Sequence, residues 1–397
     1  MNTTNITTNN NRLQQINKSL NNNNKKILVI GHTDGNGGSQ TAFKKFVDFN
    51  IKEGNNFRFI AISNDPDGTW IRQHRKYSLG TISYTTPSIT IKIFKVYQLL
   101  QSGFKIKSYA PDIMVTVGLN NSSNFLTKFM KRNSFKIAQD FTADRQYDDI
   151  MWAKSYQLFN GIALQSVSML DYWLKDSTYQ SSKLNWMPCF PEPPAYGILK
   201  RTDPLSTEKE LRMGYFGRLA DNKGLDLLIS SLSKMDDKSN IKLDIWGTGD
   251  EKASLEKLIT DLNMQQVVSL KGGFPFGDDA AKLMISYDLL VLCSTRTEGL
   301  PLILLEAMAY GLPLLVTDIG AIRDCTLNNP DTILVLPNEE SIMQGIREAY
   351  AKVKSKSFDP KRQAKYYENN FSHKVMSDRW RACLEDPGEF YSKKINS

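Results

Sequence analysis

Two cations and two carboxylates stand out in the second half of the chain. Arg218 and Lys223 flank the loop of YFGRLADNKGLDLL, between an apolar run and a stretch with helical spacing. Glu298 follows the apolar run LLVLCS, and Glu306 lies one to two turns inside the helix expected over PLILLEAMAY. Two fixed cations at the end of a strand and the start of a helix suit a diphosphate group. The two cations therefore predict a phosphate-binding site, and the two carboxylates belong to a second loop and helix further along the chain.

Glycines mark three turns that could bring the backbone close to a ligand. Gly299 directly follows Glu298 and needs no room for a Cβ atom. Gly247 lies in IWGTGDEKASLEKL, where the dinucleotide motif GxGxxG is incomplete, so a tight strand-to-helix turn stays the alternative. Gly38 lies in HTDGNGGSQTAF, a glycine-rich loop without the Lys-Ser/Thr of a P-loop. These loops suit phosphate, and the last of them argues against an NTPase.

The elements that must position these residues alternate between apolar strands and segments with helical spacing. Alternation of this kind predicts βαβ units and parallel sheets. In the first half we expect strands at 26–31, 57–62, 112–117, 135–138 and 160–165, with helices at 40–53, 89–102, 121–132 and 167–174. In the second half we expect strands LRMGYFG, IKLDIWG, VVSLKG, LLVLCS, LPLLVT and TILVL, with four helices between them and a fifth after the last strand. The predicted fold class is α/β, with two doubly wound domains that face each other across a cleft.

Composition shifts along the chain predict the domain boundaries. Residues 1–24 contain ten Asn and form an Asn-rich flexible tail in this interpretation. An N-terminal domain is expected over 25–190, and a proline-rich linker over 191–208. A C-terminal domain is expected over 209–371, followed at 372–397 by a helix that returns to the N-terminal domain.

Composition also limits the function classes. The chain has 397 residues, and no apolar run reaches the ~18–20 residues of a membrane-spanning helix. The first residues lack the apolar core of a secretory signal. The four cysteines are scattered and only three histidines are present, so neither a metal site nor a disulfide framework is expected. We therefore expect a cytoplasmic protein with no metal and no cofactor.

Charge is concentrated in one part of the first half. The net charge is +8, and residues 72–136 contain 11 basic residues and one acid, Asp112. The stretch IKIFKVYQLLQSGFKIK interleaves Lys with apolar and aromatic residues, which suits an anionic membrane surface. A solvated basic face is the alternative. Nucleic acid is not expected as a partner, since no motif of a nucleic-acid-binding module accompanies the charge.

In these motifs the sequence resembles the retaining glycosyltransferases of the GT-B fold, family GT4. The resemblance covers about residues 26–385 and is densest over 211–320. It rests on GRL-x3-KG at 217–224, on the GxG turn at 247–249, on EG-x-P-x3-LEAMA-x-G-x-P at 298–313 and on TDIGAIRD at 317–324. These elements occur in the order and at the separations of the family. The resemblance implies two Rossmann-like domains, with the donor bound by the C-terminal one and the acceptor by the N-terminal one.

The resemblance also implies roles for the cations and carboxylates. Members of the family transfer a sugar from a nucleotide diphosphate sugar with retention of its anomeric configuration. Arg218 and Lys223 match the diphosphate clamp, whose charge stabilises the leaving group without a metal. Glu306 matches the carboxylate that holds the ribose, and Glu298 matches the one that contacts the donor sugar, so that Arg218, Lys223 and Glu298 are the candidate catalytic residues.

The backbone of the donor loop takes part as well in this interpretation. The resemblance implies that N–H groups around Gly299 and Leu300 hold sugar hydroxyls and phosphate, with Gly247 also at the donor site. Gly38 and its loop would close on the diphosphate from the other domain. Residues 270–274 (LKGGF) match the segment that holds the base.

One departure concerns the catalytic helper. Many relatives have a His after the strand that reads FKIAQD in this chain, where Gln139 and Asp140 stand. Gln139 cannot act as a general base, whereas Asp140 or the phosphate of the donor can accept a proton. Asp140 is therefore the fourth candidate catalytic residue.

The sequence thus predicts a metal-independent, retaining hexosyltransferase that uses a UDP- or GDP-linked sugar. The expected acceptor is a lipid-linked or cell-surface glycan intermediate, as in polysaccharide biosynthesis. The basic stretch 72–136 would place the enzyme at the inner face of the membrane. Two alternatives stay open, a non-catalytic nucleotide-sugar-binding subunit of a glycosyltransferase complex and a nucleotide-sugar 2-epimerase.

Overall fold

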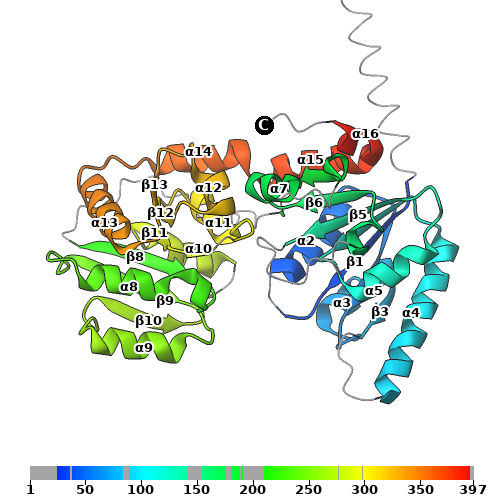
Figure 1. The fold of residues 1–397 in the computed structure, drawn as a ribbon, viewed down its shortest axis with the longest axis horizontal. Helices are drawn as coiled ribbons and strands as arrows, with labels where there is room; N and C mark the ends of the chain where they lie inside the picture. Colours follow the sequence, from blue (N-terminus) through cyan, green and yellow to red (C-terminus); the bar gives the residue numbers. More distant parts are fainter. Residues whose placement is uncertain are drawn as a thin grey trace, which may run out of the picture.

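The computed structural model describes residues 25–35, 38–83, 89–141, 154–175, 180–187, 189–190, 210–275, 277–296 and 298–393. The predicted tail 1–24 and the predicted linker 191–208 lie outside the described residues. Within them the chain forms two parallel sheets, one on each side of the unit drawn in Figure 1, with helices on both faces of each sheet.

The N-terminal sheet has seven parallel strands in the order β3-β2-β1-β4-β5-β6-β7. The strands are β1 (Ile27–His32), β2 (Phe57–Ile62), β3 (Ser78–Ile82), β4 (Ile113–Val117), β5 (Phe135–Asp140), β6 (Gly161–Leu164) and β7 (Leu184–Trp186). Its helices are α2 (Gly38–Lys52), α3 (Thr69–Gln73), α4 (Ile89–Tyr109), α5 (Asn121–Leu126) and α7 (Val167–Leu174), with 3-10 turns η1 (Arg75–Tyr77), η2 (Thr127–Phe129) and η3 (Ser181–Lys183). The central strands are buried on both faces, which is why they read as continuous apolar runs.

The C-terminal sheet has six parallel strands in the order β10-β9-β8-β11-β12-β13. The strands are β8 (Leu211–Phe216), β9 (Ile241–Trp246), β10 (Val268–Gly272), β11 (Leu289–Leu292), β12 (Leu314–Thr317) and β13 (Thr332–Val335). Its helical elements are η4 (Asp221–Lys223), α8 (Leu225–Ser233), α9 (Lys252–Asp261), α10 (Asp278–Ile285), α11 (Leu302–Ala309), α12 (Gly320–Thr326) and α13 (Glu339–Lys354).

Both sheets follow the same winding, in which the strand order reverses next to the first strand. The reversal falls between β1 and β4 in one sheet and between β8 and β11 in the other. The predicted fold class, two Rossmann-like doubly wound domains, is confirmed. Open α/β sheets bind ligands in the crevice at this reversal, outside the carboxyl ends of the strands. The loops after β8 and β11 contain the cations and carboxylates singled out above.

The sequence missed the weakest elements. Strand β3 contains a glycine and lies at the sheet edge, and β7 has only three residues, so neither produces a long apolar run. The helix expected over 121–132 ends at Leu126 and continues as η2, whereas α4 runs seven residues beyond its expected end at 102. None of the helices in the described segments is long and apolar enough to cross a bilayer.

The end of the described chain passes from one domain to the other (Figure 1). Helix α14 (Pro360–Asn370) packs on α11, whereas α15 (His373–Glu385) and α16 (Pro387–Ser392) lie on the N-terminal domain. The Trp380 ring of α15 is 1% exposed and lies 4.4 Å, centroid to centroid, from the Phe46 ring of α2. Arg379 donates to the carbonyl oxygen of Trp186 at 2.6 Å. These contacts attach the last helices to the N-terminal core.

We predict that Trp380→Ala lowers the free energy of unfolding by about 3–5 kcal/mol, because it removes a fully buried indole from a closed aromatic cluster. The neighbouring Arg381→Ala is the control. Its guanidinium pairs with Glu53 at 2.5 Å but is 48% exposed, so its removal should cost less than about 1 kcal/mol. Urea unfolding checks both values, and equal losses would show that α15 is not held by its buried face.

Candidate functional site

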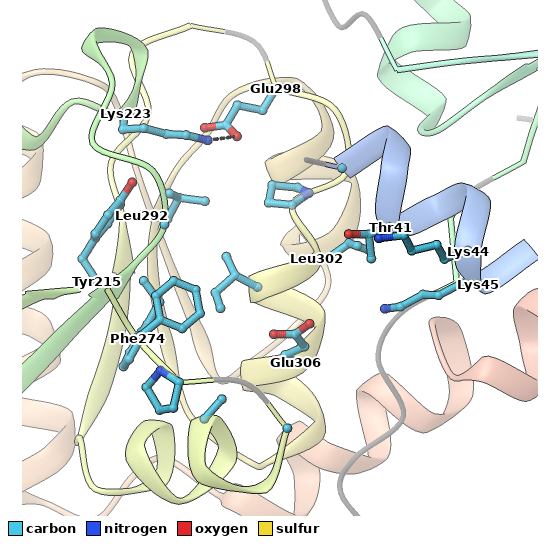
Figure 2. Close-up of a pocket in the computed structure, with 18 of the residues that line it drawn as sticks. Thr41, Lys44, Lys45, Tyr215, Lys223, Phe274, Leu292, Glu298, Leu302 and Glu306 are labelled. Carbon is cyan, nitrogen blue, oxygen red and sulfur yellow. Dashed lines mark hydrogen bonds and ion pairs between the residues drawn. The ribbon is translucent and has the colours of Figure 1, made fainter. Parts of the chain in front are cut away.

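A cleft of about 710 Å³ lies between the two domains, at the carboxyl ends of both sheets. Its N-terminal wall is formed by Trp70 and by residues of α2. Its C-terminal wall is formed by the loops after β8, β10 and β11 and by α11, and includes Lys223, Glu298 and Glu306. Figure 2 shows these side chains converging on the open space. The structure thus brings four of the predicted site residues into one cleft, namely Gly38, Lys223, Glu298 and Glu306.

Lys223 and Glu298 form an ion pair on the wall of this cleft. The Lys223 Nζ atom lies 2.5 Å from Glu298 Oε2, and the two side chains are 17% and 10% exposed. Ser294, after β11, donates its hydroxyl to the other Glu298 oxygen. The carboxylate is therefore held from two sides, and the ammonium group keeps a fixed position at the mouth of the β8 loop (Figure 2).

Glycines allow the two loops that carry this pair to approach each other. Gly224 ends η4 with a φ of +62°, and a Cβ atom there would lie 2.0 Å from the Cys293 carbonyl oxygen. Gly247 has a similar task, since its Cβ would lie 1.7 Å from the Gly217 carbonyl oxygen. Gly247 is not among the residues that line the cleft. Its position favours the tight-turn interpretation, in which it supports the β8 loop from behind.

Arg218 occupies a different position from Lys223. Its side chain is exposed and does not line the cleft, whereas its carbonyl oxygen accepts a 2.7 Å hydrogen bond from the Tyr215 hydroxyl. Burial, and then the nearby charge of Glu298, raise the pKa of Tyr215 well above its ordinary value. Tyr215 therefore stays protonated and fixes the loop backbone beside the ion pair.

The lower part of the cleft combines a carboxylate with apolar and aromatic surface. Glu306 points into it from α11, whose N-cap is Pro301. Phe274 lies opposite in Figure 2, and its ring packs edge-on against the Phe216 ring at 5.8 Å. Phe274 belongs to the segment 270–274 that the sequence suggested for the base. An apolar surface with a carboxylate beside it can hold a flat ring and an adjoining diol.

The N-terminal wall contributes cations that the sequence analysis did not single out. Thr41, Lys44 and Lys45 point from α2 towards α11 across the cleft (Figure 2). Gly38, the first residue of α2, also lines the cleft, as expected for its loop. The polar positions 41, 44, 45 and 48 recur at helical spacing on one face of an amphipathic helix, and this is the signal that could have identified them.

Gly299 and Leu300 lie against the N-terminal domain rather than in the open cleft. The Leu300 N–H donates to Gln165 Oε1 at 3.2 Å, and a Cβ on Gly299 would lie 2.4 Å from the same oxygen. Gln165 follows β6, so this bond joins the two domains. The missing side chain of Gly299 thus makes room for Gln165 rather than for a ligand. No sequence pattern marked Gln165.

A second bond between the domains lies at the start of α7. Asp324 of α12 accepts from the Ser168 N–H at 2.6 Å and from the Ser168 hydroxyl at 2.5 Å. The carboxylate thereby satisfies an N–H group that the helix itself leaves open. The TDIGAIRD segment therefore contributes a domain contact to this structure.

The structure does not bring Asp140 to the cleft. Asp140 is 5% exposed, and the Tyr156 hydroxyl donates to its carboxylate inside the N-terminal domain. Gln139 is also buried, with its amide 3.7 Å from the Cys189 sulfur. Burial raises the pKa of Cys189 to about 12, so that thiol stays protonated. The residues at the end of β5 thus belong to the core rather than to the lining of the site.

Comparisons with known proteins identify a family model and relatives that are similar to this chain. Residues 199–370 match the family model described as glycosyl transferases group 1. An uncharacterized glycosyltransferase of Methanocaldococcus jannaschii is 35% identical over 133 residues, which are 33% of this chain and 34% of that protein. The GtfA subunit of a UDP-N-acetylglucosamine–peptide N-acetylglucosaminyltransferase from Streptococcus parasanguinis is 25% identical over 46% of this chain and 37% of its own. The chain thus matches about a third of the length of these relatives.

Solved structures resemble the fold over nearly the whole chain. HepE of Anabaena in complex with UDP superposes with a TM-score of 0.72 at 13% identity, over 90% of this chain and 99% of that one. A glycosyltransferase of Rickettsia africae gives a TM-score of 0.70 at 18% identity, over 94% and 100%. At these identities the likeness concerns the fold, and that fold is GT-B.

We predict that Gly224→Ala destabilises the C-terminal domain by at least about 2 kcal/mol, because the new methyl group meets the Cys293 carbonyl in a left-handed backbone. Gly273→Ala is the matched control, since open space surrounds that position. Urea unfolding measures both. Equal stability of the two variants would contradict the close approach of the β8 and β11 loops.

Proposed function

The C-terminal half of the chain belongs to the glycosyl transferases group 1 family, and on this premise we propose that the protein is a retaining, metal-independent glycosyltransferase. Its donor in this proposal is a UDP- or GDP-linked hexose. The observation that carries the proposal is the Lys223–Glu298 pair, 2.5 Å apart in the cleft where the strand order of the C-terminal sheet reverses. It offers a fixed cation for a diphosphate beside a carboxylate for sugar hydroxyls.

The proposed reaction breaks the bond between the anomeric carbon of the sugar and the β-phosphate oxygen. The bonding electrons pass to that oxygen, and the Lys223 ammonium stabilises the negative charge that develops there. The acceptor hydroxyl attacks the anomeric carbon from the same face, and its proton passes to the departing phosphate. This route needs no protein base, which fits the buried positions of Gln139 and Asp140. Arg218 would join the clamp by a side-chain movement from its exposed position.

The remainder of the cleft suits the nucleoside and the acceptor. Glu306 would accept hydrogen bonds from the ribose hydroxyls, with the base on Phe274. On the opposite wall, the ammonium groups of Lys44 and Lys45 favour an acceptor that carries phosphate. A lipid-linked or cell-surface glycan intermediate has this chemistry. The basic stretch 72–136 would then hold the enzyme at the cytoplasmic face of the membrane.

A non-catalytic subunit remains the second candidate. The streptococcal relative is itself described as a subunit of an N-acetylglucosaminyltransferase. The position that the family resemblance assigns to a His carries the buried Gln139 in this chain. A subunit of this kind would bind the nucleotide sugar and leave the transfer to its partner.

We predict that the purified chain, in EDTA, slowly releases the nucleoside diphosphate from one donor among UDP-, GDP-, ADP- and TDP-sugars. Membrane extract should accelerate the release. Glu306→Ala should weaken donor binding about tenfold or more, because the ribose hydroxyls lose the carboxylate to which they would donate hydrogen bonds. Chromatography of the released nucleotide and calorimetric titration provide the measurements.

The control is Glu340→Ala, on the exposed surface of α13, which should bind and release as the parent does. Release that requires a divalent cation would contradict metal independence. Tight binding without turnover, even with membrane extract, would favour the non-catalytic subunit. If the chain neither binds any of the donors nor releases a nucleotide from them, both proposals are excluded.

A further inference from the structure

Helix α4 carries a row of large apolar side chains on its outer surface. Ile93, Tyr97, Leu100 and Phe104 follow one another at intervals of four, three and four residues and therefore share one face. They are between 40% and 68% exposed. The row extends over about 16 Å of helix at 1.5 Å per residue. Phe94 and Val96, more than half exposed, widen it.

The opposite face of α4 fixes the orientation of this row. Ser102 and Ile106 are buried, and a Cβ on Gly103 would lie 2.6 Å from the Phe129 ring of η2. The glycine is the point of closest approach, so the helix cannot rotate about its axis without a steric clash. The apolar row therefore stays in solvent while the other face packs on β3, α5 and η2.

The row differs from the scattered apolar residues of an ordinary protein surface. Within the described residues, twelve large apolar side chains are exposed, and six of them lie on α4. Single exposed apolar residues need no explanation, whereas a contiguous patch marks an interaction surface. Figure 1 places α4 on the side of the N-terminal domain that faces away from the C-terminal domain, so neither domain covers it.

Exposed cations border the row. The ammonium groups of Lys107 and Lys128 lie 5.6 Å from the centroids of the Phe129 and Phe125 rings, which hold them beside the helix. Arg132, which follows η2 in the sequence, is also exposed. The single acid of the stretch, Asp112, pairs with Lys131 at 3.0 Å and lies outside the row. The surface thus complements a partner that is apolar within and anionic at its surface.

We propose that α4 lies in the plane of an anionic bilayer interface. The side chains of Ile93, Leu100 and Phe104 enter the acyl boundary, while Lys107 and Lys128 contact lipid phosphates. An aliphatic and aromatic row with flanking lysines has the composition of an interfacial helix. The inference rests on the proposed function in one respect, since the membrane contact would bring the enzyme to a membrane-borne acceptor. Binding to vesicles can be measured without catalysis. Contact through α4 leaves the C-terminal domain and the mouth of the cleft unobstructed.

The test is co-sedimentation of the full chain with vesicles of phosphatidylcholine and with an equimolar mixture of phosphatidylcholine and phosphatidylglycerol. We expect binding to the mixed vesicles that weakens about tenfold or more in Leu100→Ser/Phe104→Ser, because two inserted side chains are lost. Lys107→Glu/Lys128→Glu should lose the preference for anionic vesicles. The matched control, Leu327→Ser/Leu336→Ser, removes exposed leucines of the C-terminal domain and should bind as the parent does.

Melting temperature and donor binding in the cleft should be unchanged in each of these variants, which excludes misfolding as the cause. A chain that does not sediment with anionic vesicles, or a Leu100/Phe104 variant that sediments as the parent does, would overturn the inference. If the parent chain is a dimer in sedimentation equilibrium and the Leu100/Phe104 variant is a monomer, the inference is overturned, because the row then binds a second copy of the chain. If the chain releases nucleotide from the donor but does not bind vesicles, the bilayer contact is overturned, whereas the proposed glycosyl transfer is not.

Discussion

The arrangement of the site depends on the ion pair between Lys223 and Glu298. The pair joins the loops after β8 and β11, the two neighbouring strands at which the sheet order reverses. The two side chains are only 17% and 10% exposed, so that either charge would destabilise the fold if its partner were removed. The pair therefore holds the two loops at a fixed distance. Gly224 is required because these loops then touch, and Ser294 completes the carboxylate's partners. A cation held in this way needs no rearrangement to meet a phosphate group.

Polar bonds join the N-terminal domain to the C-terminal domain beside the cleft. Gln165 accepts from the Leu300 backbone, and Asp324 accepts from the start of α7. Bonds of this kind can break and re-form at modest cost, which would suit the proposed transfer reaction if the two domains open for substrate and close around it. Because Leu300 directly precedes Pro301 and α11, movement of the N-terminal domain would act on the helix that carries Glu306.

The sequence predicted the sheets well and the interior of the cleft only in part. Buried parallel strands are continuous apolar runs, so β1, β2, β4 and β8 could be read directly, whereas β3 and β7 are short edge strands with little apolar signal. Lys223 and Glu298 were found because they stand in loops that follow strands, and Glu306 because it lies in the helix expected directly after Glu298. Gln165 was not found, because a side-chain amide that accepts a hydrogen bond from a distant backbone N–H produces no local sequence pattern. Asp140 was placed by analogy along the chain, but its side chain turns towards Tyr156 in the core.

The most direct test of the account separates the structural role of the ion pair from its role in binding. Replacing both partners, as Lys223→Met/Glu298→Leu, should leave the free energy of unfolding within about 1 kcal/mol of the parent, because an apolar pair can substitute for a buried ion pair. Calorimetric titration of this variant with UDP and GDP should nevertheless show affinity reduced about tenfold or more, since the cation for the diphosphate is gone. Parent-like nucleotide affinity in the double variant would contradict the account and reduce the pair to a structural contact.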